Sequence, residues 1–319
     1  MTVRLRSLAA GLLVAGLAGL AACSSDGQTP VPVPTPTPQV SRVAAAPQTC
    51  DNATQSYQPD GLPGPDALPA NSTMAKIKKR GYLIAGVSGD TYLLGARNPK
   101  TGTIEGFDID MVKAVTKAIF GDASKYSLRV ITADDRIPLL ESGEIDIVVR
   151  AMSMTCDRWD QVAFSAVYYQ AGQKVMVRTD SDIETLADLD GRKVCAPNGT
   201  SSIDNLLRTV PAATVVPART HTGCLVMFQT GAVDAITGDD TVLAGLAAQD
   251  PYARVLTKEQ AFSSEPYGIG IKADNIDLVR FVNAKLDQMR ENGEWQASYD
   301  KWLAPRLGAA KPPKPQYGR

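Results

Sequence analysis

The side chains that most often perform catalysis or bind metals are scarce in this chain. It has a single histidine, His221, whereas imidazole sites for zinc or iron usually need two or three such ligands. None of its five cysteines stands at C-x-x-C spacing, and no G-x-S-x-G sequence marks an activated serine. We therefore expect neither a metal site nor another resident cofactor.

The charge balance excludes a further class of function. The chain has 319 residues, with 33 lysines and arginines against 34 aspartates and glutamates. A protein that binds nucleic acid normally has a basic surplus, so none is expected as a partner. Hydrophobic residues make up 44% of the chain, which is enough to bury one or two cores.

The first residues have the layout of a secretory signal. Arg4 and Arg6 precede an apolar run over 8–20, which is too short for a membrane span, and small residues follow it. The sequence Leu20-Ala21-Ala22-Cys23 resembles the lipobox of bacterial lipoproteins. We therefore predict a signal peptide over 1–22 and a lipid anchor on Cys23, which would hold the protein on the extracytoplasmic face of the cell membrane.

Proline and turn-forming residues predict how the two ends behave. Proline stands at every second position of residues 30–38, which favours an extended spacer. We assign 23–71 to a linker and N-terminal extension, and place the start of compact structure near Ser72. The proline-rich, basic end is expected to be a disordered tail over 306–319.

Between these ends, strand-like and helical patterns alternate. Strands are expected over 82–87, 128–131, 145–149, 193–196, 214–216 and 235–236, and helices over 107–115, 137–141 and 203–208. Such alternation predicts parallel α/β sheets with ligands beyond the carboxyl ends of the strands, and two α/β series imply two lobes. Two further helices are expected over 275–303, with Trp295, Tyr299 and Trp302 in the core.

A series of motifs follows in order along residues 73–303. They are Gly106-Phe107-Asp108-Ile109-Asp110, Asp146-Ile147-Val148-Val149, Ala151-Met152-Ser153-Met154-Thr155, Asp157-Arg158, Phe164-Ser165, Tyr168-Tyr169, Leu189-Asp190-Gly191, Gly199-Thr200, Gly231, Asp234-Ala235, Trp295 and Trp302. Together they resemble the extracellular solute-binding proteins (family 3) of polar amino-acid ABC transporters, and most of all the actinobacterial lipoproteins of the glutamine, glutamate and aspartate branch.

The resemblance implies the type II periplasmic-binding-protein fold, in which two α/β lobes are joined by two crossing hinge strands. The crossings fall near 168–172 and 264–267. Lobe 1 would then comprise 72–170 and 265–305, and lobe 2 would comprise 171–264.

Four cysteines remain after Cys23, and an exported protein meets oxidising conditions that favour two disulfides. Three connectivities are possible. We favour Cys195–Cys224, which would lie within lobe 2, and Cys50–Cys156, which would fasten the extension to the body.

The resemblance also implies how a free amino acid is held. In the family, the arginine at the position of Arg158 binds the α-carboxylate, and planar guanidinium suits that group. The groups assisting it stand at Ala151, Ser153 and Thr155. The turn formed by Gly199, Thr200 and Ser201 would add backbone donors ahead of a helix.

The α-ammonium needs a carboxylate from the other lobe. Asp239 has the family's offset from the Gly231 to Ala235 motif, although a slip of one residue would exchange it for Asp240. We prefer Asp239. Asp90, after the first strand, would either add a second acceptor or cap its own loop.

Arg136 matches the arginine that contacts the side-chain carboxylate in aspartate- and glutamate-binding relatives. Together with Arg158 and Asp239 it gives the pocket a net charge of +1, which favours glutamate or aspartate over glutamine or asparagine. Arg97 is a weaker candidate for the same role. His221 lies in a loop that faces the cleft in relatives, and we expect a neutral structural histidine there.

The expected function is capture of an amino acid by a monomer that serves the transmembrane subunits of an ABC permease. A sensor that reports the amino acid to a membrane signalling partner would use the same binding body. A dehydratase-like enzyme on this fold would need a free acid or base in the cleft. Asp239 is already assigned to the ammonium and His221 has no evident partner, so we expect no enzyme.

Overall fold

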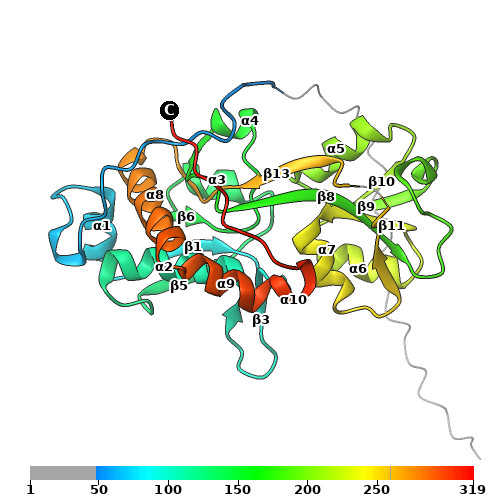
Figure 1. Ribbon diagram of the computed structural model, residues 1–319, viewed down its shortest axis with the longest axis horizontal. Coiled ribbons are helices and arrows are strands. Elements are labelled where there is room, and N and C mark those ends of the chain that lie inside the picture. Colours follow the sequence, from blue (N-terminus) through cyan, green and yellow to red (C-terminus); the bar gives the residue numbers. More distant parts are fainter. Residues whose placement is uncertain (1–47, 259) are drawn as a thin grey trace, which may run out of the picture. The chain divides into compact units, whose positions relative to one another are not determined.

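The computed structural model describes residues 48–258 and 260–319 (Figure 1). The predicted signal peptide, the lipid anchor at Cys23 and the proline-rich spacer lie outside these ranges. Within them, no helix combines the length and the apolar character needed to cross a membrane.

The first lobe is built on a five-stranded sheet in the order β5-β1-β6-β14-β7. β1 pairs in parallel with β5 and β6, whereas β14 pairs antiparallel with β6 and β7. The strands are β1 (Leu83–Val87), β5 (Tyr126–Val130), β6 (Ile147–Val148), β7 (Val162–Phe164) and β14 (Gly270–Lys272). A small antiparallel sheet is formed by β2 (Asp90–Thr91), β3 (Gly95–Arg97) and β4 (Ile104–Glu105).

Helix α2 shows why the helices of this lobe form where they do. Phe107, Met111 and Ile119 lie on one face of the helix and are fully buried. The helix ends at Gly121, whose φ of 73° suits glycine and whose N–H donates to the carbonyl of Lys117. The helices of the lobe are α1 (Thr73–Arg80), α2 (Phe107–Phe120), α3 (Arg136–Glu141), α4 (Cys156–Trp159), α8 (Ile276–Glu291), α9 (Glu294–Trp302) and α10 (Ala304–Leu307), with a 3-10 turn η1 (Pro65–Ala67).

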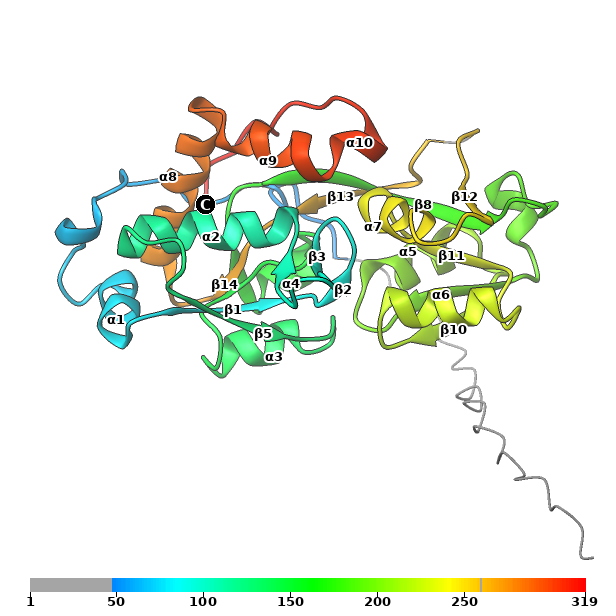
Figure 2. The same cartoon turned by 90° about the horizontal axis from the view of Figure 1, so that it is seen from below.

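The second lobe contains a sheet in the order β10-β9-β11-β8-β12. Its strands are β8 (Tyr169–Arg178), β9 (Lys193–Pro197), β10 (Thr214–Ala218), β11 (Ala235–Asp239) and β12 (Ala253–Val255). Apolar clusters pack against this sheet, and helices surround it (Figure 2). These are α5 (Ser201–Thr209), α6 (His221–Gln229), α7 (Asp240–Ala247) and the 3-10 turn η2 (Leu186–Leu189).

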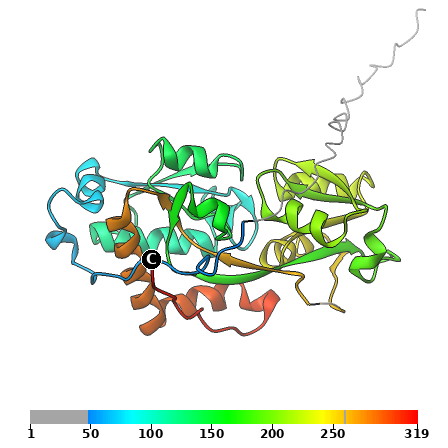
Figure 3. The ribbon, with the colours of Figure 1, turned by 90° about the horizontal axis from the view of Figure 1, so that it is seen from above.

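Two strands connect the lobes. β8 and β13 (Ser263–Tyr267) pair antiparallel, from Tyr169 opposite Tyr267 to Gln173 opposite Ser263. The green and orange strands can be followed side by side in Figures 1 and 3. Both lie at the predicted crossings, so the two-lobe α/β fold with two crossing strands is confirmed.

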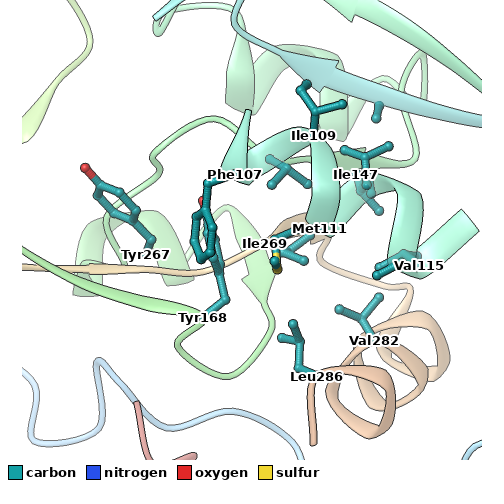
Figure 4. Packing of buried hydrophobic residues seen from close by; sticks show 14 of the residues in the cluster. Phe107, Ile109, Met111, Val115, Ile147, Tyr168, Tyr267, Ile269, Val282 and Leu286 are labelled. Atoms are coloured by element: carbon teal, nitrogen blue, oxygen red, sulfur yellow. The ribbon is translucent and has the colours of Figure 1, made fainter. Parts of the chain in front are cut away.

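Aromatic side chains fix the point where the crossings leave the first lobe. Phe107, Tyr168 and Tyr267 lie beside one another in Figure 4, with ring centroids about 6 Å apart. Trp295 stacks on Tyr299 at 5.1 Å, and its indole N–H donates to the carbonyl of Tyr168 at 2.7 Å. Trp295 and Tyr299 are therefore core residues, as predicted, and Trp295 ties α9 to the first crossing strand. Trp302, predicted with them, is only partly buried and packs against the edge of this core.

Both predicted disulfides, Cys50–Cys156 and Cys195–Cys224, are present. The predicted start of compact structure near Ser72 is wrong, because the extension packs against the body from residue 50. Ser56 is completely buried there, and its hydroxyl donates to the carbonyl of Phe164 at 2.7 Å.

The disordered tail predicted over 306–319 is also wrong. Tyr317 forms a parallel bridge with Ser56 and its hydroxyl donates to Asp287 at 2.7 Å. Arg290 donates to the carbonyl of Pro313 at 3.0 Å. The tail is therefore held against α8 at Pro313 and Tyr317, although its proline and basic residues suggested disorder.

Candidate ligand-binding site

The lobes enclose a cavity at the carboxyl ends of the parallel strands. The first lobe contributes Ser88, Thr91, Asp108, Arg136, Arg150, Ala151, Ser153 and Arg158, and the second contributes Thr200, Ser201, Ser202, His221, Asp239 and Val242. Its volume is about 440 Å³, open solvent at the mouth included. Because both lobes form its wall, a molecule bound there would contact both lobes.

Two of the cavity's arginines reach from the first lobe to the second. Arg136 opens α3, and Arg158 lies in the single turn of α4. Both guanidinium groups donate to the carbonyl of Gly199 in the second lobe, at 2.7 Å from Arg136 and 3.2 Å from Arg158. Arg158 is also held by the carbonyl of Ser153 at 2.6 Å. The same side chains that face the cavity thus contact the opposite lobe.

Burial makes these positive charges costly. Burial, and next the neighbouring charge of Arg158, lower the pKa of Arg136. Burial likewise lowers the pKa of Arg158, against the opposing effect of Glu265. An anion bound in the cavity would offset this cost and stabilise the charged guanidinium groups.

A third arginine, Arg150, lines the cavity and was missed by the sequence analysis. It stands two residues after the end of β6, is 8% exposed, and donates through Nε to the carbonyl of Ile131 at 2.9 Å. Its position in the sequence could have indicated this role, because Arg150 stands just beyond the carboxyl end of a parallel strand, where ligand-binding residues collect.

Asp108 supports the loop at Ala151, next to Arg150. The motif over 106–110 that contains Asp108 did not predict this role. Its carboxylate accepts from Tyr168 at 2.9 Å and from the backbone N–H of Ala151 at 3.0 Å. Ala151 has a φ of 42°, in the left-handed region that costs a residue with a Cβ. Burial raises the pKa of Asp108 to about 6, even though its hydrogen bonds oppose that shift.

Asp239, rather than Asp240, lies on the cavity wall. It ends β11 and is 7% exposed, and its Oδ2 accepts from the hydroxyl of Tyr267 at 2.6 Å. Its buried Oδ1 has no hydrogen-bond partner among residues 48–258 and 260–319. Burial first, and then the negative charge of Glu265, raise the pKa of Asp239 to about 8. Asp240 is the first residue of α7, and its carboxylate accepts from the N–H of the next residue, Thr241, at 2.7 Å.

His221, the first residue of α6, also lines the cavity. Burial, and next the positive charge of Arg150, lower its pKa to about 3. The imidazole is therefore neutral at ordinary pH, and its Nε2 is buried without a hydrogen-bond partner within the described ranges.

Four predicted residues lie away from this wall. Thr155 and Gly199 border a neighbouring groove, in which Thr155 caps α4. Asp90 accepts from Ser88 through its carboxylate and from Thr222 through its carbonyl. Arg97 is exposed and donates to the carbonyl of Gly102 in its own hairpin, so the structure does not bring it to the cavity.

The fold and the cavity define a class of protein, the two-lobe binding proteins that hold a small solute between their lobes. Residues 83–305 match the family of bacterial extracellular solute-binding proteins, family 3. The chain belongs to this family, which confirms the predicted resemblance. The family consists of binding proteins rather than enzymes and is extracellular, so the protein acts on the extracytoplasmic side.

Relatives of known identity agree with this assignment. The chain is 40% identical over 232 residues to the glutamine-binding protein of Geobacillus stearothermophilus, covering 72% of this chain and 87% of the relative. It is 31% identical over 253 residues to the glutamate-binding protein GluB of Corynebacterium efficiens, covering 76% and 84%. A solved ancestral arginine-binding protein bound to glutamine superposes with a TM-score of 0.66 at 31% identity, covering 72% and 99%.

Replacing Asp239 by asparagine should remove a pH dependence of stability. With a pKa of about 8 in the folded protein against 3.8 for an unperturbed carboxyl, Asp239 holds a proton that the unfolded chain has released. The free energy of unfolding therefore falls between about pH 4 and about pH 8. Asparagine stays neutral, so the stability of Asp239→Asn relative to the parent should rise across this range.

Urea unfolding at a series of pH values, without added amino acid, measures this difference. The exposed Asp274→Asn serves as the control, and its stability relative to the parent should stay level. A level profile for Asp239→Asn as well would contradict the assigned burial effect.

Proposed function

We propose that the protein captures a polar amino acid outside the cytoplasm, prefers glutamate or aspartate, and presents it to an ABC importer. The observation that carries the proposal is that Arg158 and Asp239 face one cavity from opposite lobes. An α-carboxylate suits the planar guanidinium of Arg158. An α-ammonium would supply the hydrogen-bond donor that Asp239 Oδ1 otherwise lacks.

The charges of the wall support an acidic ligand. Among the residues that line the cavity, three arginines, Arg136, Arg150 and Arg158, face two carboxyl groups, Asp108 and Asp239, which leaves +1 on the lining when both are ionised. The buried Glu265 lies outside this lining and accepts from the hydroxyl of Ser201 at 2.7 Å. Protonation of either aspartate only increases the surplus. Glutamate and aspartate carry a net charge of −1 at neutral pH and would balance the wall.

Glutamine and asparagine are weaker candidates for the same cavity. One relative is named for glutamine and another for glutamate, so a side-chain carboxyl or carboxamide suits the family. A carboxamide accepts hydrogen bonds from arginine but adds no charge. An uncompensated buried charge costs on the order of 3–5 kcal/mol, which favours the acids.

Closure of the lobes would couple binding to recognition by the importer. Gly199 accepts hydrogen bonds from Arg136 and Arg158, and the hydroxyl of Ser201 donates to Glu265 of the crossing strand at 2.7 Å. A ligand that contacts both lobes stabilises the closed arrangement over the open one, and a permease then distinguishes the two.

The proposal includes attachment to the membrane through a lipid on Cys23, supported by the lipobox-like sequence that precedes it. Cys23→Ser should release the protein from the membrane fraction, because the serine hydroxyl is not a substrate for thioether lipidation. Fractionation of expressing cells, followed by immunoblotting, measures this. Retention of the variant at the parental level would overturn the anchor.

Calorimetric titration with the amino acids tests the ligand. We expect the tightest binding for glutamate and aspartate, and Arg158→Ala should bind none of the amino acids. Arg136→Ala should lower the preference for glutamate over glutamine by about tenfold, which corresponds to about 1.4 kcal/mol. The preference is the relevant quantity because Arg136 also contacts Gly199 and its loss weakens closure for every ligand.

Arg129→Ala is the matched control, since this arginine of the same lobe pairs with Glu144 at the surface. It should leave the preference unchanged. Equal losses for glutamate and glutamine in Arg136→Ala would refute the specificity argument, and a parent protein that binds no amino acid would refute the function itself.

A further inference from the structure

Helix α4, which carries Arg158, is a single turn of four residues. One turn is not stable in isolation, because a helix this short does not repay the cost of nucleation. Its orientation therefore depends on what holds it from outside. The two ends of the turn, Cys156 and Trp159, flank Arg158, and both are held by parts of the chain distant in sequence.

The N-terminal extension holds both ends of the turn. Cys156 forms the disulfide with Cys50, and the indole N–H of Trp159 donates to the carbonyl of Ala53 at 2.7 Å. The ring of Tyr57 meets Trp159 edge-on at 6.4 Å. The ring of Phe164 of β7 also meets Trp159 edge-on, with ring centroids 5.2 Å apart.

The C-terminal residues complete this contact. The guanidinium of Arg319 lies 3.9 Å from the ring centroid of Trp159, within the range of a cation–π interaction. Arg319 also donates to the carbonyl of Gln55 at 3.0 Å and to the carbonyl and side chain of Asn52 at 2.9 and 3.0 Å. Figure 1 shows the blue extension and the red tail meeting on this side of the lobe.

We call residues 50–57 and 317–319 the clamp. The clamp is fastened to the core independently of α4. The Asn283 side chain of α8 donates to the hydroxyl of the buried Ser56 at 2.9 Å, and Tyr317 donates to Asp287 of the same helix. It therefore has a rigid backing against which it holds the single turn.

The clamp lies outside the part of the chain that defines the family, since the family match covers 83–305. Clamp residues such as Cys50 and Arg319 therefore lie outside the matched residues. They converge on the short helix that carries the proposed carboxylate-binding arginine.

We propose that the clamp positions Arg158 for ligand binding, with the Cys50–Cys156 disulfide and Arg319 as positioning groups. This inference rests on the proposed role of Arg158. Without the clamp, α4 would sample other orientations, and only a fraction of molecules would present the guanidinium correctly. The apparent dissociation constant rises in inverse proportion to that fraction.

Titration with glutamate tests the inference on the purified, folded protein. Arg319→Ala and the double variant Cys50→Ser with Cys156→Ser should each raise the dissociation constant by about tenfold, as expected if about a tenth of the molecules remain competent. Arg319→Lys, which keeps a cation over Trp159, should recover part of the loss. Lys301→Ala is the matched control, because it removes a cation–π contact within α9, with Trp302, rather than one with α4, and it should change the dissociation constant by less than about twofold.

A second titration distinguishes positioning of Arg158 from a general structural role of the clamp. It measures the effect of Arg319→Ala on the dissociation constant in an Arg158→Lys background. If the clamp acts through the guanidinium, the second change should cost less than about twofold there. Unchanged affinity in the folded clamp variants, or an equal loss with lysine at 158, would overturn the inference. Failure of the parent to bind any amino acid would instead overturn the proposed function, so the two failures are distinguishable.

Discussion

Holding several arginine side chains inside a cavity that closes costs free energy, and the rest of the binding body is arranged around that cost. Arg136 and Arg150 are buried and Arg158 is partly buried, and burial lowers the pKa of each. Opposite them, Asp239 is buried so deeply that its pKa rises to about 8. Neither the arginines nor Asp239 is well compensated by the protein groups around it. A solute that carries a carboxylate at one position and an ammonium at another would relieve both, and its net charge would balance the remainder.

The scaffold supplies these charges by ordinary features of the α/β fold. Parallel strands end at the cavity, so residues just beyond them face it, as Arg150 does after β6 and Asp239 does at the end of β11. Less regular pieces need extra support. Asp108 holds the loop at Ala151 by accepting its N–H, and the extension and tail surround the single turn of α4. The crossing strands keep the two walls within one hinged body, which is what lets a ligand act on both.

Much of this organisation was predictable from sequence because it depends on local patterns and on motifs. The alternation of strands and helices predicted the sheets, and the motif around Arg158 placed that residue on the cavity wall. Other features depend on distant contacts that leave no local signal. The tail at 306–319 has a disordered composition, yet Arg319 and Tyr317 find partners in Asn52 and Asp287. Arg97 failed as a cavity residue because its hairpin directs it to solvent, which spacing alone does not reveal.

The most direct measurement of the central claim is a crystal structure of the protein with glutamate bound. The account predicts one molecule between the lobes, with its α-carboxylate hydrogen-bonded to Arg158, its ammonium on Oδ1 of Asp239, and its side-chain carboxylate facing the remaining arginines. A glutamate bound in the reverse orientation, or one that contacts a single lobe, would contradict it.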